Sequence, residues 1–272
     1  IETISNLIEL NILKSNAKNI IIITEKKQNI LNLIAKKYNL FFIEHKNFLG
    51  GRYSVLSEVG IVPAYLMGVN VTKLRNNLKK YFEAKEKSFL KKSSIALCEI
   101  LNKKNYTNLI FLNYAPKLEK LLFWCQQLIA ESLGKKGKGL LPVISNAPKD
   151  HHSLLQLYFD GPKDKIFYIF SEKESHGKKL KIKKITNKAD FLENKDIDQI
   201  KSAQKNALKK VLKKNKIPFR EFNINYVDEQ TLGEFFSYFI LETAIAGKLA
   251  NINPFDQPAV EQVKVFTKKI LR

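Results

Sequence analysis

Short apolar runs of strand length alternate in this chain with longer stretches of helical periodicity, and this alternation constrains the fold most. The first run, Ile20-Ile21-Ile22-Ile23, is continuously apolar, which is typical of a strand buried on both faces of a parallel sheet. Strands are expected at residues 19–24, 40–43, 108–112, 140–145, 165–171 and 219–226. Helices are expected at residues 4–14, around 30–34, over most of 59–103, and at 117–133, 195–216, 229–249 and 259–270. This order predicts an α/β fold with parallel sheets covered by helices.

Two polar residues stand where helix caps are expected. Thr24 directly follows the first strand, and its hydroxyl is predicted to cap the next helix. Asp228 precedes the strongly apolar stretch 229–249 and is predicted to cap it in the same way. The glycine- and lysine-rich run 134–139 fits neither a P-loop nor a dinucleotide-binding spacing, so a flexible turn is the simpler interpretation.

The net charge of +21 raises nucleic acid as a partner, but the type of basic residue argues against it. Of 47 basic residues, only Arg52, Arg75, Arg220 and Arg272 are arginine, and the lysines are scattered. Base readout and bidentate phosphate contacts favour arginine, so we expect no nucleic-acid partner. A basic interaction protein would instead show binding to bulk DNA that depends steeply on salt.

Membrane insertion and secretion also find no support in the sequence. Every apolar run is far shorter than the roughly 20 residues that span a bilayer, so no membrane partner is expected. The start of the chain lacks the pattern of a signal peptide. Cys98 and Cys125 lie in apolar helical stretches and are interpreted as buried thiols rather than a disulfide or a metal site. A cytoplasmic protein without metal or cofactor is expected.

The segment NFLGGRYSVLSEVG, residues 47–60, places an arginine directly after two glycines. Glycine accepts positive φ and lets a ligand approach the main chain closely. The Arg52 guanidinium is permanently charged and presents a planar fork of donors. Together these residues indicate a loop that holds developing negative charge. On Gly50-Gly51-Arg52 alone, a strand-to-helix turn with a surface arginine explains the pattern equally well.

Three further segments follow in order: QQLIAES at 126–132, DHHSLLQL at 150–157 and GKLANINPFDQPAVEQVK at 247–264. With residues 47–60, they resemble the signature segments of the phosphoglucose isomerase (glucose-6-phosphate isomerase) family. The chain departs from the family at Glu58, where a small residue is usual, and at Ala250, where a bulky apolar one is usual.

The resemblance implies two three-layer α/β/α domains of the sugar-isomerase type with mainly parallel sheets. Residues 1–88 would be the remainder of the first domain with connecting helices, 89–249 the second domain, and 250–272 a C-terminal arm carrying an active-site lysine. The first domain would be truncated at its N-terminal side, because residues 1–3 resemble the tail of a phosphate-binding loop. The chain is therefore expected to be a fragment with little activity of its own.

The implied activity is the reversible aldose–ketose isomerisation of glucose 6-phosphate to fructose 6-phosphate through an enediolate, in glycolysis and gluconeogenesis. The protein would thus be an isomerase that binds carbohydrate derivatives and needs no cofactor. The alternative is a non-catalytic sugar-phosphate-binding module, which would not be expected to keep all the catalytic residues together.

The resemblance assigns roles to four catalytic residues. Glu131 would be the base, and Arg52 would stabilise the enediolate. His152 would assist ring opening from the partner subunit of a homodimer, together with Lys264. The substrate-binding residues would be Gln127, Gln257, Thr3 and Gly51. His151 is interpreted as a structural neighbour of His152.

Overall fold

The structure is a computed structural model, and it describes residues 2–173, 180–183 and 186–272. It divides into two compact units, residues 1–71 and residues 72–272. Each unit is described by itself. The domain boundaries expected at residues 88 and 249 stay a prediction.

The first unit holds a small parallel sheet with its helices. Its elements are α1 (Glu2–Glu9), β1 (Ile21–Thr24), α2 (Ile30–Lys37), β2 (Phe41–Glu44), the 3₁₀ helix η1 (Gly51–Leu56) and α3 (Glu58–Leu66). β1 and β2 pair in parallel, as predicted. Two details of the prediction are wrong. Asn29, not Thr24, caps α2 by accepting from the backbone N–H of Asn32. β1 is only partly buried, because β2 is its single neighbour among the described strands.

The second unit is built on a four-stranded parallel sheet in the order β4-β3-β5-β6. Its helices begin with the short α4 (Val71–Arg75) and η2 (Lys80–Phe82). The remaining elements are α5 (Ala84–Lys103), β3 (Asn108–Asn113), η3 (Pro116–Leu118), α6 (Glu119–Leu133), β4 (Leu141–Asn146), α7 (Lys149–Asp160), β5 (Lys165–Glu172), η4 (Asn187–Leu192), α8 (Ile197–Lys214), β6 (Phe219–Ile224), α9 (Glu229–Leu249) and α10 (Pro258–Ile270). The predicted strands and parallel pairing are confirmed, as is the Asp228 cap of α9.

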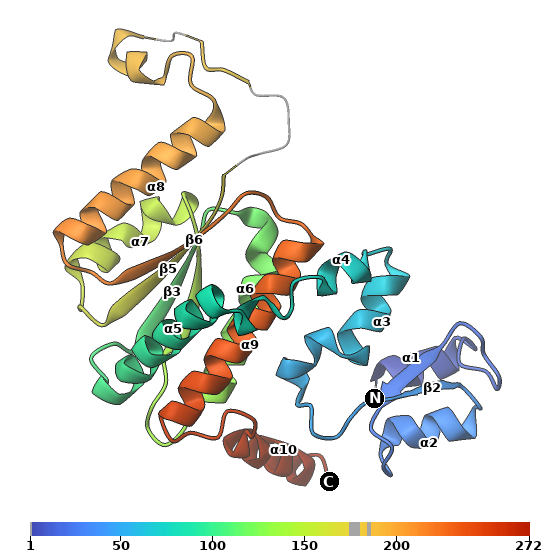
Figure 1. The fold of residues 1–272 in the computed structure, drawn as a ribbon. Coiled ribbons are helices and arrows are strands. Elements are labelled where there is room, and N and C mark those ends of the chain that lie inside the picture. Colours follow the sequence, from blue (N-terminus) through green and yellow to red (C-terminus); the bar gives the residue numbers. More distant parts are fainter. Residues whose placement is uncertain (1, 174–179, 184–185) are drawn as a thin grey trace. The chain divides into compact units, whose positions relative to one another are not determined.

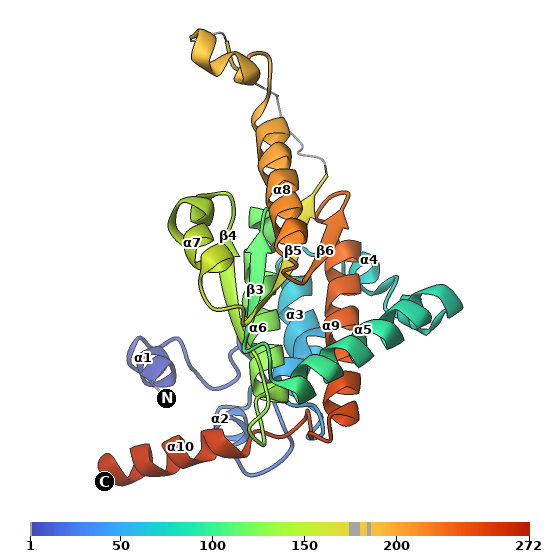
Figure 2. The same cartoon turned by 90° about the vertical axis from the view of Figure 1, so that its left-hand side faces the viewer.

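Helices cover both faces of this sheet, which gives the three expected layers (Figures 1 and 2). α7 and α8 lie on one face, and α5, α6 and α9 lie on the other. Side chains alternate along each strand, so one face of β3 and β5 packs against α7 and α8. The core on that side comprises Ile110, Leu112, Phe167, Ile169, Tyr158, Leu208 and Leu212.

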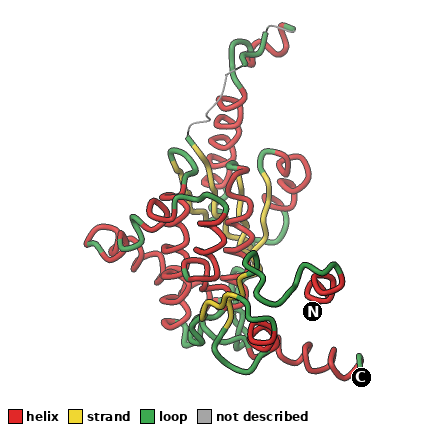
Figure 3. Tube along the Cα trace, turned by 90° about the vertical axis from the view of Figure 1, so that its right-hand side faces the viewer, coloured by secondary structure: helices red, strands yellow, loops and turns green. Residues whose placement is uncertain are grey.

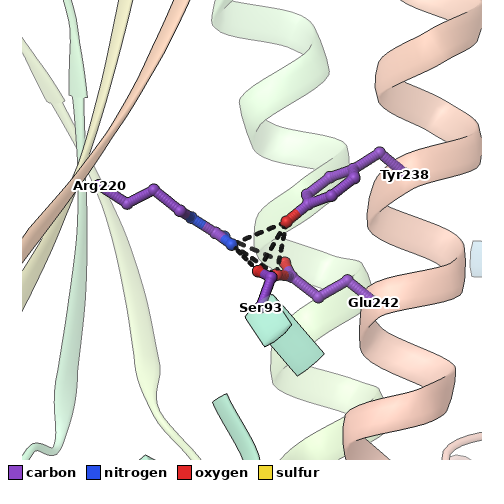
Figure 4. Close-up of polar contacts among 4 residues, drawn as sticks. All are labelled: Ser93, Arg220, Tyr238 and Glu242. Atoms are coloured by element: carbon purple, nitrogen blue, oxygen red, sulfur yellow. Dashed lines mark hydrogen bonds and ion pairs between the residues drawn. The ribbon is translucent and has the colours of Figure 1, made fainter. Parts of the chain in front are cut away.

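The opposite face of the sheet carries aromatic rings and one buried ion pair. Arg220 on β6 reaches across to Glu242 on α9, with Nη1···Oε1 at 2.5 Å and Nη2···Oε2 at 3.1 Å. Tyr238 donates its hydroxyl to the same carboxylate at 2.7 Å, and Ser93 of α5 joins the cluster (Figure 4). This network ties the strand to two helices. Because Arg220 outweighs the effect of burial, the pKa of the Glu242 carboxyl is held below its ordinary value.

Two helices have features beyond the sandwich itself. α7 was not predicted from the sequence. α10 extends away from the end of α9 and is exposed along most of its length (Figure 3). Over the described part of the chain, no helix combines the length and the apolar character that crossing a membrane requires.

Candidate active site

Glu131 lines a cavity of about 840 Å³ at the amino edge of the second unit's sheet. It lies in the last turn of α6, half-buried, next to the loop that leads into β4. Gln127, one helical turn earlier, donates its side-chain amide to Glu131 Oε1 at 3.0 Å. Gln257, just before α10, lines the same cavity. The structure thus brings together the predicted base and two predicted substrate-binding residues, although they are far apart in sequence.

Lysines of the 134–139 loop build one wall of this cavity by binding the chain after α9. Lys138 Nζ donates to the carbonyl of Ala250 at 2.9 Å, and Lys136 Nζ donates to that of Asn251 at 3.0 Å. Lys135 contacts Asp256 at 2.9 Å. Cations at a helix C-terminus stabilise its exposed carbonyls. The run is a turn, as expected, and its lysines form a clamp that shapes the cavity; its flexibility stays a prediction.

Close packing explains two small residues of the C-terminal signature segment. A Cβ on Gly247 would approach Pro254 Cβ to 3.1 Å and Leu133 Cδ2 to 3.2 Å, so α9 meets the end of α6 tightly here. Ala250 is buried directly after α9. The clamp and these contacts fix where the chain turns toward Gln257, and so they position one side of the cavity.

The Gly50-Gly51-Arg52 segment belongs to the first unit. Arg52 lies in η1 and is buried, with its guanidinium 5.3 Å from the centre of the Tyr53 ring. Neither glycine uses its freedom to adopt a positive φ: Gly50 has φ −65°, and Gly51 is not among the glycines with positive φ. A Cβ on Gly51 would meet nothing within 4 Å. Space beside Gly51, rather than an unusual backbone, is therefore what the glycine provides.

Gly60 and Glu58 are the residues of this segment that the fold explains best. A Cβ on Gly60 would come within 2.0 Å of the Val55 carbonyl oxygen, so only glycine lets α3 pack against η1. Glu58 Oε2 lies 3.5 Å from His45 Nδ1, and His45 Nε2 lies 2.9 Å from the Leu49 carbonyl oxygen. A backbone hydrogen bond and the nearby His45 lower the pKa of Glu58. The family departure at Glu58 thus has a local partner.

His151 and His152 lie in the first turn of α7, at the carboxyl edge of the sheet. His152 is exposed. His151 is half-buried, and its Nε2 lies 2.5 Å from the Tyr114 hydroxyl. Burial lowers the pKa of His151 and raises that of Tyr114, which favours a phenol donating to a neutral imidazole. His152 and Glu131 therefore lie at opposite edges of one chain's sheet.

Two further predicted residues lie on helices of different units. Lys264 is on α10, about one turn beyond Val260, which lines the cavity. Thr3 is in α1 of the first unit, and its side chain lies outside the described part. Among the residues that the structure describes, no group of three or more His, Cys, Asp or Glu side chains is arranged to hold a metal.

Comparisons with known proteins identify the family. The family model "Phosphoglucose isomerase" matches residues 3–272. The chain is 32% identical over 280 residues to the "Probable glucose-6-phosphate isomerase" of Methanococcus maripaludis, covering all of this chain and 63% of that protein. It is also 32% identical over 281 residues to the glucose-6-phosphate isomerase of Mycoplasmopsis pulmonis, covering 98% and 64%. The chain thus spans somewhat under two thirds of the length of these relatives.

Solved structures agree in fold. A hypothetical protein from Thermus thermophilus matches with a TM-score of 0.84 at 27% identity, covering 99% of this chain and 68% of that one. A glucose-6-phosphate isomerase from Chlamydia trachomatis matches with a TM-score of 0.77 at 17% identity, covering 99% and 56%, which speaks for the fold alone. From the match over residues 3–272 and the relatives above 30% identity, we conclude that the chain belongs to the phosphoglucose isomerase family.

Proposed function

We propose that this chain is part of a glucose-6-phosphate isomerase, which interconverts glucose 6-phosphate and fructose 6-phosphate. The observation that carries the proposal is the cavity in which the Glu131 carboxylate, held by Gln127, faces the same space as Gln257. A carboxylate that is positioned by a neighbouring amide and opens into a cavity is equipped to take a proton from carbon. Family membership supplies the substrate class.

In the proposed reaction, Glu131 takes the proton from C2 of the open-chain aldose. The C–H electron pair forms the C1–C2 double bond, and the C1 carbonyl oxygen becomes the enediolate oxygen. The hydroxyl proton on O2 then moves to O1, the C2–O bond becomes the new carbonyl, and the C1–C2 electron pair takes the proton back from Glu131 at C1, which gives the ketose. C2 is oxidised while C1 is reduced, so the two changes balance within the substrate. We assign stabilisation of the enediolate to Arg52, whose charge is permanent.

We assign ring opening to His152 and Lys264, and substrate binding to Gln127, Gln257, Gly51 and Thr3. The open space beside Gly51 supports its assignment, because a substrate can approach the main chain there. The placement of Glu131 and His152 at opposite edges of the sheet supports a homodimer in which His152 serves the partner's site. The role in glycolysis and gluconeogenesis, and with it a cytoplasmic location, forms part of the same proposal.

The direct test is isomerase activity of the complete enzyme, in which this chain is joined to its expected upstream segment, in a coupled assay with Glu131→Gln as the variant. We expect a loss of kcat of about 10² to 10⁴, because an amide cannot accept the proton. Glu99→Gln on the exposed face of α5 removes a solvent-exposed carboxylate that pairs with Lys103, so its rate should equal that of wild type. A complete wild-type protein that binds glucose 6-phosphate without turnover would favour a non-catalytic binding module instead.

Sharing of the site can be tested by mixing two inactive variants. In a dimer of one Glu131→Gln chain and one His152→Ala chain, one site loses both groups and the other keeps both. Random reassociation makes half of the dimers mixed, so activity should return to about one quarter of wild type. A mixture that stays inactive would show that each site takes both residues from one chain.

A further inference from the structure

A second cavity, of about 310 Å³, lies at the carboxyl edge of the second unit's sheet and is polar. It lies where β5 and β6 end and where the first half of α8 faces them. The side chains that matter here are Ser171, Glu221, Asn223, Lys201, Lys205 and Lys209. Its volume falls at the lower end of the range for small-molecule sites.

The topology of the sheet favours a ligand at this position. From β3 the chain moves to β4 on one side, and it then returns to β5 on the other side of β3. In open α/β sheets, ligands bind outside the carboxyl ends of the strands at such a reversal. Tyr114, directly after β3, lines the cavity, so the cavity reaches this reversal point. The Glu131 cavity lies at the opposite, amino edge of the sheet and shares no lining residue with this second cavity, so the proposed isomerase reaction does not use the second cavity.

Three lysines on α8 face the crevice at a spacing of one helical turn each. The side chains of Lys205, Lys209 and Lys201 are only 12%, 23% and 27% exposed. Withdrawing ammonium groups from water costs free energy unless they gain partners. Leu208 and Leu212 of the same helix belong to the core that packs against the sheet, so the lysines lie beside the buried stripe of α8.

One carboxylate serves two of these lysines. Glu221 lies 2.5 Å from Lys209 Nζ and 3.4 Å from Lys205 Nζ, and Lys205 also donates to the Ser171 hydroxyl at 2.9 Å. Burial opposes ionisation of Glu221, but the two ammonium groups outweigh it and hold its pKa below the ordinary value. The Lys205–Lys209–Glu221 group thus carries one net positive charge, and the other charged residues that line the cavity (Lys173, Lys201, Glu172 and Asp198) add no net charge to it. Each ammonium has three donors, so both lysines keep donors for a ligand.

We propose that this cavity is a second ligand site, which binds a small phosphate ester of a polyol. The net positive charge and the spare ammonium donors suit the phosphate group. Ser171 is buried and holds both Lys205 and the Asn223 amide, and that amide suits a hydroxyl group on the same ligand. The site is separate from the Glu131 cavity, and the proposal does not depend on the isomerase reaction.

Chemical labelling of the purified protein tests the site residue by residue. Acetic anhydride acetylates lysines, and peptide mass spectrometry gives the rate at each position. With inorganic phosphate or glycerol 3-phosphate at constant ionic strength, labelling of Lys205 and Lys209 should slow at least fivefold. Lys213, exposed on the same helix, should label at an unchanged rate. Glycerol 3-phosphate should protect at lower concentration than phosphate. Equal rates with and without both anions would overturn the proposal.

A pair of matched variants tests the role of the lysines. Lys201→Ala/Lys205→Ala keeps Lys209 as the partner of Glu221, and it should raise the glycerol 3-phosphate concentration that half-protects Lys209 about tenfold or more. Lys210→Ala/Lys213→Ala removes the same charge from exposed positions of α8 and should leave that concentration unchanged. An equal shift in both variants would reduce the effect to general charge and would contradict the proposal. Isomerase activity should be the same in both.

Discussion

Removing the carboxylate of Glu242 should destabilise the second unit by about 3 kcal/mol. The side chain of Glu242 is 1% exposed, and its carboxylate neutralises the Arg220 guanidinium through two hydrogen bonds. Glu242→Leu would leave that charge in place, and breaking a buried ion pair typically costs about 3 to 5 kcal/mol. We expect the lower end, because the guanidinium stays stacked 4.0 Å from the Tyr168 ring centre and its side chain is 20% exposed.

Urea unfolding followed by tryptophan fluorescence measures this cost, because the only tryptophan, Trp124, packs against Phe236 in the same unit. The double variant Arg220→Met/Glu242→Leu removes both charges and should recover most of the loss. Because the pKa of Glu242 is lowered in the folded state, the ion pair stabilises the fold at pH values above the ordinary pKa of a glutamate. This stabilisation is lost as the pH falls from that ordinary pKa through the lowered pKa of the folded state. A cost below about 1 kcal/mol for Glu242→Leu, or a double variant as unstable as the single one, would refute the reasoning.

Two further predictions concern the second unit. Burial lowers the pKa of His151, so on acidification the imidazole takes up a proton more readily in the unfolded chain than in the folded one, and the free energy of unfolding should fall as pH drops from about 7 to about 5.5. In urea titrations, His151→Asn should reduce this dependence on pH. An unchanged dependence would contradict the prediction. Gly233→Ala would place a Cβ 1.8 Å from the Leu74 carbonyl oxygen and should lower the free energy of unfolding by about 1 to 3 kcal/mol. Gly247→Ala would place a Cβ 3.1 Å or more from side-chain atoms and should cost less. The reverse order in thermal unfolding would be inconsistent with this packing.

The strands were predictable because their apolar residues form short runs or, in β6, alternate with polar residues, but α7 was missed. Its first turn is polar, with the two histidines, and this hid the helical spacing of the apolar residues that follow. Leu154, Leu155, Tyr158 and Phe159 repeat at positions that fit one face of a helix and pack against the sheet. Counting these positions would have found the helix.

The candidate site was predictable only where its signal is local. Glu131 and Gln127 share one helical turn, so their proximity follows from their spacing. The clamp of Lys136 and Lys138 on the end of α9 joins residues more than a hundred positions apart, and no local pattern reveals it. The role of Gly60 could not be predicted for the same reason. A glycine is required there because α3 packs closely against Val55, and this contact exists only in the folded chain.

The most direct test of the proposed chemistry is deuterium exchange at C2 of glucose 6-phosphate, followed by NMR in D₂O. A base that lifts this proton exchanges it with solvent before returning it, so the complete wild-type enzyme should introduce deuterium at C2. Glu131→Gln should reduce this exchange by about 10² or more while its calorimetric affinity for glucose 6-phosphate stays within about threefold of wild type. Exchange at the wild-type rate in Glu131→Gln would contradict the assignment of Glu131 as the base.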